Sequence, residues 1–341
     1  MSYDKHFFRI YFLFTCLIIL NACSSEKPGP QISGITMGTT YSLQWSDDTS
    51  IGLESLQQDI TTRLEQINQL MSTYLPNSQL SEFNQSRDIG WHAVDIELAS
   101  VVKSALDICQ KSEGAFDITV GPLVNLWGFG ASEANFKFPT ETEIDIALCS
   151  IGCQHLEVRL SPPAINKKVP TLYVDLSAIA KGYAVDQLAT ILDKYKLQHY
   201  MVEIGGEIKA KGVAPHGDSW RIGIETPHKL RGSIVDVISL DNIAVATSGD
   251  YRNFFEHQDQ RYSHTINPKT GYPIKHELAS VTILNESTAE ADAWATAFMV
   301  LGANKSIQIA DELQLSGLLI TRHGDDYKKT TFGKMGSYLT Q

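Results

Sequence analysis

Strand-like runs that follow one another without helices between them are the feature that most constrains the fold. Between residues 200 and 285, apolar residues alternate with polar ones, and Gly, Pro, Asn and Asp separate the runs. The runs are YMVEIGGEIKAKG (200–212), WRIGIETP (220–227), GSIVDVISLDNIAVATSG (232–249), YSHTINPKTGYPI (262–274) and ASVTILN (279–285). Consecutive strands, with helices gathered before and after them, are typical of an α+β domain and not of a doubly wound parallel sheet.

Helical patterns flank these strands. Leu56, Ile60 and Leu64 belong to an apolar stripe with three- and four-residue steps between residues 53 and 71. Further helices are predicted over 95–113, 178–195, 287–302 and 304–313, strands over 32–45 and 171–177, and a closing hairpin over 317–332. We therefore predict an α+β fold with a mostly antiparallel, β-rich core and helices packed around it, in which a helical N-terminal lobe packs on a β-rich lobe.

The first residues are typical of a targeting segment. Two basic residues precede the apolar run Ile10–Leu20, which is too short to span a bilayer. The run ends in LNAC, which resembles a bacterial lipobox, and Cys23 directly after an alanine favours lipidation over a plain secretory peptide. The expected organisation is a lipoprotein signal peptide over 1–22, acyl chains (palmitate) on Cys23, a flexible tether over 23–33 and one domain over 34–341 that faces the periplasm.

The net charge and the cysteine content argue against nucleic-acid binding and against a zinc site. The chain carries 28 Lys and Arg against 39 Asp and Glu, a formal net charge of −11. An acidic chain does not suit nucleic acid, and a polyanionic ligand would need a cation to bridge it to the protein. Beyond the front end, Cys109, Cys149 and Cys153 form an odd set. Cys149 and Cys153 could pair, at least one buried free thiol is expected, and no Cys/His cluster indicates zinc.

An acidic residue in an apolar helix gives the strongest chemical signal. In STAEADAWATAFMVLG, Ser287 and Glu290 form an S-x-x-E capping box, so Asp292 lies beyond the first turn and caps nothing. Asp292 and Thr296 are four residues apart and therefore share one face of the helix. A buried carboxylate without a partner is costly, and a hard cation accounts for both oxygens. Mg²⁺ takes about six oxygen ligands, often including substrate phosphates, so we expect a magnesium ion completed by a bound diphosphate.

Other polar residues lie in apolar or Gly-rich surroundings. Phe116 and Asp117 follow a predicted helix, Asp175 ends a predicted strand before Lys181, and His264 lies in a strand that enters the N-P-K-T-G turn. The two aspartates could equally be cap or turn residues, the histidine a structural one, and Thr296 a donor to the carbonyl four residues earlier. The common phosphate-binding, nucleophile-elbow and zinc-protease motifs do not occur in the sequence.

Several of these stretches together resemble the ApbE family, the bacterial FAD:protein FMN transferases. The stretches, in the family's order, are GTTYSL, MSTYLPNSQLSEFN, GAFDITVGPLVNLWGFG, VDLSAIAKGYAVD, AVATSGDYRNFF, SHTINPKTGYPI and DAWATAFMVLG, and the likeness extends from about Gly34 to the C-terminus. The resemblance implies an ApbE-like fold of two interlocked lobes and a flavin transferase that uses FAD as substrate and Mg²⁺ as cofactor.

The resemblance also implies roles for single residues. Magnesium would be held by Asp292, Thr296 and the backbone carbonyl of Ala178. The general base is inferred from side-chain chemistry and not from the resemblance: His264 is the expected base, because an imidazole exchanges protons near neutral pH, and Asp292 is the alternative. FAD would be held by Met37, Tyr74, Ala115, Phe116, Asp117, Asp175, Lys181 and Ile266.

The implied reaction is attack of a threonine hydroxyl of another protein on the FMN-side phosphorus of FAD, with release of AMP. This chain lacks the Ser/Thr-Gly-Ala-Thr-like segment of the family's acceptors, so it is expected to modify other proteins. Expected acceptors are subunits of the sodium-translocating NADH:quinone oxidoreductase and of the Rnf complex, which places the anchor in the inner membrane; Ser24 leaves the outer membrane as the alternative. The rival hypotheses are an FAD pyrophosphatase that releases FMN and AMP, and a non-catalytic FAD-binding lipoprotein.

Overall fold

The computed structural model describes residues 29–48, 52–130, 137–227, 233–251, 254–257, 260–324 and 326–340. The predicted signal peptide and Cys23 lie outside this part of the chain. Within it, no helix is both long and apolar enough to cross a membrane.

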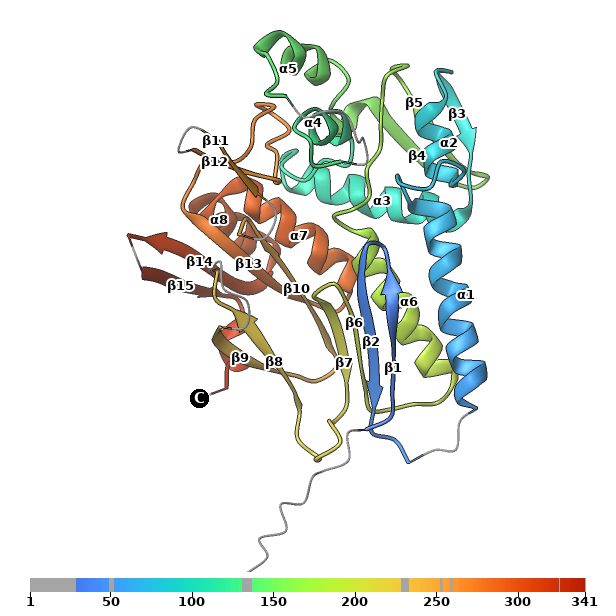
Figure 1. The fold of residues 1–341 in the computed structure, drawn as a ribbon, viewed down its shortest axis with the longest axis vertical. Helices are drawn as coiled ribbons and strands as arrows, with labels where there is room; N and C mark the ends of the chain where they lie inside the picture. The colour runs from blue at the N-terminus through green and yellow to red at the C-terminus, as the bar shows by residue number, and fades with distance from the viewer. Residues whose placement is uncertain are drawn as a thin grey trace, which may run out of the picture.

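One large sheet organises the described chain (Figure 1). It has eight strands in the order β1-β2-β6-β7-β10-β13-β14-β15, and every neighbouring pair is antiparallel. The strands are β1 (Gln31–Thr36), β2 (Thr39–Trp45), β6 (Tyr200–Ile204), β7 (Glu207–Lys211), β10 (Ile243–Gly249), β13 (Leu278–Asn285), β14 (Ser316–His323) and β15 (Asp326–Phe332). The prediction of an α+β fold with mostly antiparallel pairing is confirmed. The hairpin β1–β2 forms one edge of this sheet and the hairpin β14–β15 the other, so segments from opposite ends of the described chain belong to one sheet.

Three smaller sheets and the helices surround the large sheet (Figure 1). The small sheets are β3-β5-β4, from β3 (Gly90–Ala93), β4 (Leu156–Leu160) and β5 (Pro163–Lys167), then β8 (Trp220–Glu225) with β9 (Ile234–Leu240), and β11 (Phe254–His257) with β12 (Gln260–Ser263). The helices are α1 (Leu53–Met71), α2 (Gln79–Gln85), α3 (Ile96–Lys111), α4 (Gly121–Leu126), α5 (Glu141–Leu148), α6 (Ala180–Lys194), α7 (Thr288–Leu301) and α8 (Ala303–Leu313), with short 3-10 turns η1 (Cys153–His155) and η2 (Met335–Ser337).

Strands β13 and β14, inside the large sheet, have buried side chains on both of its faces, to which period-2 alternation sends neighbouring residues in turn. On β14, Leu319 joins the main core, which lies under the helices, whereas Leu318 and Ile320 join a second core with residues of β8 and β9. On β13, Val281 and Leu284 divide in the same way. This double burial explains why ASVTILN is an almost continuous apolar run and not a clean alternation.

Helices α6 and α7 position the functional residues, and they lie against each other. A Cβ added to Gly182 would lie 2.3 Å from the carbonyl oxygen of Thr288, so only glycine permits this approach. Asp186, one turn further along α6, accepts hydrogen bonds from Ser287 Oγ and from the backbone N–H groups of Thr288 and Ala289. A carboxylate of one helix thus caps the other and fixes the start of α7 against α6.

Several expected elements differ from the observed ones. Residues 32–45 form a hairpin and not one strand, with its turn at Met37 and Gly38, and β1 begins inside the predicted tether, at Gln31. The segment 171–177 forms no strand and pairs with none in the described parts of the chain: the Asn84 side chain bonds the backbone of Val174, and the N–H of Asp175 donates to the carbonyl of Ile118 at 2.7 Å.

Two local predictions near the site are also wrong. His264 follows β12 and does not lie within a strand. Only half of the predicted capping box forms: Ser287 Oγ accepts from Glu290 N at 3.3 Å, but the N–H of Ser287 donates to Asn285.

Candidate functional site

A cavity of about 550 Å³ lies between α7, the β6–β7 turn, the end of β10 and the loops that follow α3 and β12. It brings together residues that are far apart in the sequence. Its wall includes Tyr74, Ala115, Phe116, Asp117, Asp175, Ala178, Lys181, His264, Ile266, Asp292 and Thr296. Met37 is the one predicted site residue outside this wall; it lies in the β1–β2 turn, partly buried against the main core.

Asp292 and Thr296 both face the cavity from α7, as their spacing predicts. Asp292 is only 3% exposed, and its Oδ2 accepts from the N–H of Gly182 at 3.3 Å. Burial raises the pKa of the Asp292 carboxyl, and the nearby ammonium of Lys181 opposes that shift. Thr296 Oγ1 lies 3.2 Å from Ser248 Oγ on β10. The hydroxyl therefore has a partner across the cavity wall in addition to any bond within its own helix.

Lys181 has a different environment from the one its predicted role implies. Its Nζ is 2.8 Å from Glu207 Oε1 and 3.6 Å from Asp292 Oδ2. Burial alone would lower the pKa of Lys181, but the two carboxylates outweigh burial and raise it, so the side chain is a cation. Glu207, which follows the Gly205–Gly206 turn in EIGGE, was not predicted as a site residue, because the strand it opens, EIKAK, also carries two lysines and gives an acidic residue no special prominence.

The oxygen atoms around Asp292 suit a hard divalent cation. Carboxylate, hydroxyl and backbone carbonyl oxygens are the donors that Mg²⁺ prefers. The Gly182 N–H donates to Asp292 and not to the Ala178 carbonyl four residues earlier, which leaves that carbonyl outside the helical ladder. Among the described residues, Glu207 Oε2 is buried without a hydrogen-bond partner. An anionic, incompletely satisfied site of this kind fits the predicted ligands Asp292, Thr296 and Ala178.

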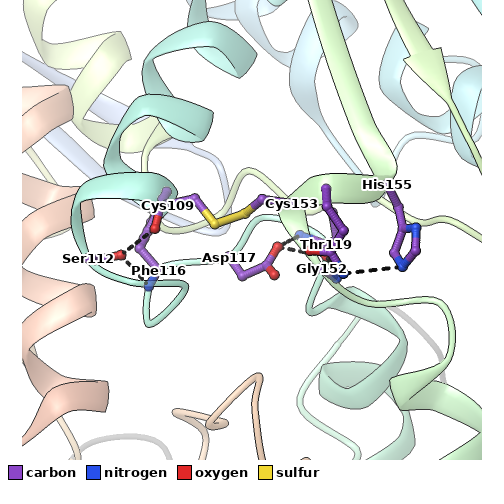
Figure 2. Close-up of a disulfide and its surroundings, with 9 residues drawn as sticks. Cys109, Ser112, Phe116, Asp117, Thr119, Gly152, Cys153 and His155 are labelled. Carbon is purple, nitrogen blue, oxygen red and sulfur yellow. Dashed lines mark hydrogen bonds between the residues drawn. A yellow bond between two sulfur atoms is a disulfide. The ribbon is translucent and has the colours of Figure 1, made fainter.

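Asp117 is held in place by hydrogen bonds to Thr119 and to the loop that carries the disulfide (Figure 2). Its Oδ1 accepts from the N–H and the hydroxyl of Thr119 at 2.8 and 2.7 Å, and Thr119 Oγ1 accepts from the N–H of Gly152 at 2.7 Å. The N–H of Cys153 donates to Asp117 as well. Burial raises the pKa of Asp117, while these hydrogen bonds oppose the shift. The carboxylate is thus held in place at the cavity wall, and its bond to the N–H two residues further on is also the bond that the alternative, a turn residue, would make.

The disulfide joins Cys109, at the end of α3, to Cys153 in η1. The suggested Cys149–Cys153 pair is therefore wrong. The expectation of a buried free thiol is also wrong, because Cys149 is free but exposed. Cys109, Cys153 and Asp117 are close enough to hold a metal, but both sulfur atoms are already bonded to each other and are not available as thiolates.

Asp175, Tyr74 and His264 complete the wall. Asp175 Oδ1 accepts from the N–H and hydroxyl of Ser177 at 2.8 and 2.6 Å. Tyr74 is 65% exposed, and its pKa is raised by burial of its hydroxyl and by the charge of Asp175. The His264 ring meets the Phe129 ring edge-on at 6.3 Å between centroids, which orients the imidazole at the cavity wall.

Comparisons with known proteins agree with this geometry. The sequence model of the ApbE family matches residues 37–319. The chain is 42% identical over 328 residues to the FAD:protein FMN transferase of Vibrio cholerae, covering 95% of this chain and 97% of that protein. The solved flavin transferase ApbE from Vibrio cholerae superposes with a TM-score of 0.84 at 40% identity, over 92% of this chain and all of that one. The ApbE protein from Thermotoga maritima gives a TM-score of 0.81 at 28% identity, over 92% of this chain and 99% of that one. The chain belongs to the ApbE family, as its motifs predict.

Proposed function

We propose that this protein transfers the FMN moiety of FAD to a threonine hydroxyl of a target protein in a Mg²⁺-dependent reaction. Names of relatives that are similar over almost their whole length support the reaction class. The observation that carries the proposal is the pair of buried Asp292 and half-buried Thr296 on one face of α7, which faces a cavity also lined by Asp117 and Asp175. These oxygens suit a cation that a dinucleotide's diphosphate would complete.

Asp292, Thr296 and the carbonyl of Ala178 would hold the Mg²⁺. Bound there, the ion would neutralise negative charge on the diphosphate as the phosphorus–oxygen bond breaks. Tyr74, Phe116, Asp117 and Asp175 would bind and orient the FAD, and Lys181 would add positive charge beside its phosphates. The apolar wall, including Ile266, would limit the access of water, which competes with the acceptor hydroxyl.

His264 is the proposed general base. Its ring lies in the cavity wall, and a neutral imidazole has a pKa close to the working pH. It would accept the proton of the threonine hydroxyl while the oxygen forms a bond to the FMN-side phosphorus; the bond to AMP breaks and AMP leaves. The product is a phosphoester-linked FMN.

The proposed acceptors are periplasm-facing flavoprotein subunits, such as those of the sodium-translocating NADH:quinone oxidoreductase and the Rnf complex. Lipidation at Cys23 would hold the enzyme near them at the inner membrane, on its periplasmic side. The net charge of −11 does not suit nucleic acid, and a membrane anchor would bring the enzyme close to other membrane-bound proteins.

The test measures AMP and FMN from FAD and Mg²⁺, with and without an acceptor domain. We expect AMP release to require the acceptor and to be about 100-fold slower in His264→Ala at saturating FAD. Free FMN released equally well without acceptor would indicate a pyrophosphatase, and FAD binding without any AMP would indicate a carrier. A His264→Ala variant with the full rate would show that another group is the base.

A further inference from the structure

Three ionisable side chains line one side of the cavity, and the two acidic ones are buried. Asp292 and Glu207 are carboxylates, and Lys181 lies between them. Asp292 is 3% exposed and Glu207 is 4% exposed. The cluster places two acidic groups around one ammonium, and a cation bound at Asp292 would favour the ionised form of that carboxyl.

Lys181 is held unequally by the two carboxylates. Its Nζ makes a 2.8 Å ion pair with Glu207 but lies 3.6 Å from Asp292, beyond ordinary hydrogen-bond length. Gly182, the next residue of α6, donates its backbone N–H to Oδ2 of Asp292, the same oxygen that lies nearest to Lys181. Lys181 thus forms a close ion pair with Glu207 of β7 and only a longer contact with Asp292 of α7.

Among the described residues, Lys181 is the main partner of the Glu207 carboxylate, which also accepts from its own backbone N–H. Glu207 is the first residue of β7, and of its two oxygens Oε1 contacts Lys181, whereas Oε2 has no hydrogen-bond partner within the described chain. Leaving a buried carboxylate oxygen unsatisfied is costly. A role for Glu207 in fixing the position of the Lys181 ammonium would explain why this unfavourable burial is retained.

That position matters because an ammonium and a divalent cation compete for the same carboxylate. Without Glu207, the Lys181 ammonium would have only Asp292 as an anionic partner and would move onto it. We propose that Glu207 is a positioning residue that holds the ammonium of Lys181 off Asp292, so that Asp292 stays available to a divalent cation. This inference rests on the proposed function, because it assumes that the cation site is at Asp292.

The experiment is a double-mutant cycle on binding of Mn²⁺ alone to the full-length chain, measured by the EPR signal of free Mn²⁺. We expect Glu207→Gln to weaken Mn²⁺ binding about tenfold in the native background. In a Lys181→Met background, where no ammonium competes, the same substitution should change the dissociation constant by less than about twofold. Lys181→Met by itself should tighten Mn²⁺ binding.

Glu203→Gln is the matched control. Glu203 is on β6 of the same hairpin, and its Oε1 accepts from the N–H of Gly206 at 2.7 Å, so the variant removes an equal charge without touching Lys181. It should leave Mn²⁺ binding within about twofold of the native value. If Lys181→Met does not fold, Lys181→Gln, whose amide can still donate to Glu207, replaces it in the cycle.

The outcomes separate this inference from the function it rests on. Equal weakening by Glu207→Gln in both backgrounds would mean that Glu207 attracts the cation directly, which overturns the positioning role and leaves the cation site intact. No Mn²⁺ binding by the native chain would overturn the proposed metal site and this inference with it.

Discussion

Removing the Cys109–Cys153 disulfide should destabilise the protein and loosen one wall of the cavity. The bond joins residues 44 positions apart, and closing a loop of that length in the unfolded chain corresponds to about 4 kcal/mol of stability. The same loop supplies the Gly152 and Cys153 N–H groups that hold Thr119 and Asp117. Removing the disulfide should therefore lower the free energy of unfolding and also leave Asp117 less firmly held at the cavity wall.

The assay is urea unfolding of a Cys109→Ala/Cys153→Ala variant, with FAD binding measured on the same samples. We expect the free energy of unfolding to fall by about 4 kcal/mol and FAD binding to weaken. Cys149→Ala is the control: that thiol is exposed and free, so its change should stay within about 0.5 kcal/mol. The native chain treated with a reductant should behave like the double variant.

A loss below about 1 kcal/mol in the double variant would refute this reasoning. So would finding Cys109 or Cys153 as a free thiol in the native protein under oxidising conditions. Weakened FAD binding with unchanged stability would show that the loop acts only locally.

Two further predictions concern the packing of the helices. Gly182→Ala places a Cβ 2.3 Å from the carbonyl oxygen of Thr288, so α6 and α7 must separate. We expect the free energy of unfolding in urea to fall by about 1–3 kcal/mol and Mn²⁺ binding to weaken. Native values for both would contradict the close approach of the two helices. Burial lowers the pKa of Lys167 from 10.5 to about 8, so between those pH values the unfolded chain binds more protons than the folded one. Below about pH 8 both states of the chain carry the charged lysine, so the destabilisation caused by its burial is constant. Above that pH, the free energy of unfolding of the native chain should rise relative to that of Lys167→Met. A difference between the two free energies that does not change with pH would contradict the lowered pKa.

The local parts of the fold were predictable from sequence. The apolar stripe of α1, the paired runs of β6–β7 and β14–β15, and the apolar character of α7 each follow from residues close together in the chain. Asp292 was predictable as a site residue for the same reason, since a carboxylate beyond the first turn of an apolar helix needs a partner. The resemblance to ApbE then supplied the remaining candidates.

Contacts between distant segments were not predictable. Glu207 is far from Lys181 in sequence, and nothing near either residue indicates that the β6–β7 turn brings them to 2.8 Å. The disulfide was mispredicted because Cys149 and Cys153 are neighbours in sequence, whereas the true partner, Cys109, is brought close only by packing of α3 on η1. Similarly, 171–177 has strand composition, but Asn84 and a loop carbonyl take the hydrogen bonds that a neighbouring strand would have made.

Intact-mass measurement of an acceptor domain incubated with FAD, Mg²⁺ and this enzyme tests the central claim most directly. The native enzyme should add the mass of one FMN group in a Mg²⁺-dependent manner, and Asp292→Ala, although folded, should add none. Transfer by Asp292→Ala at the native rate, or by the native enzyme after complete removal of divalent cations, would contradict that claim.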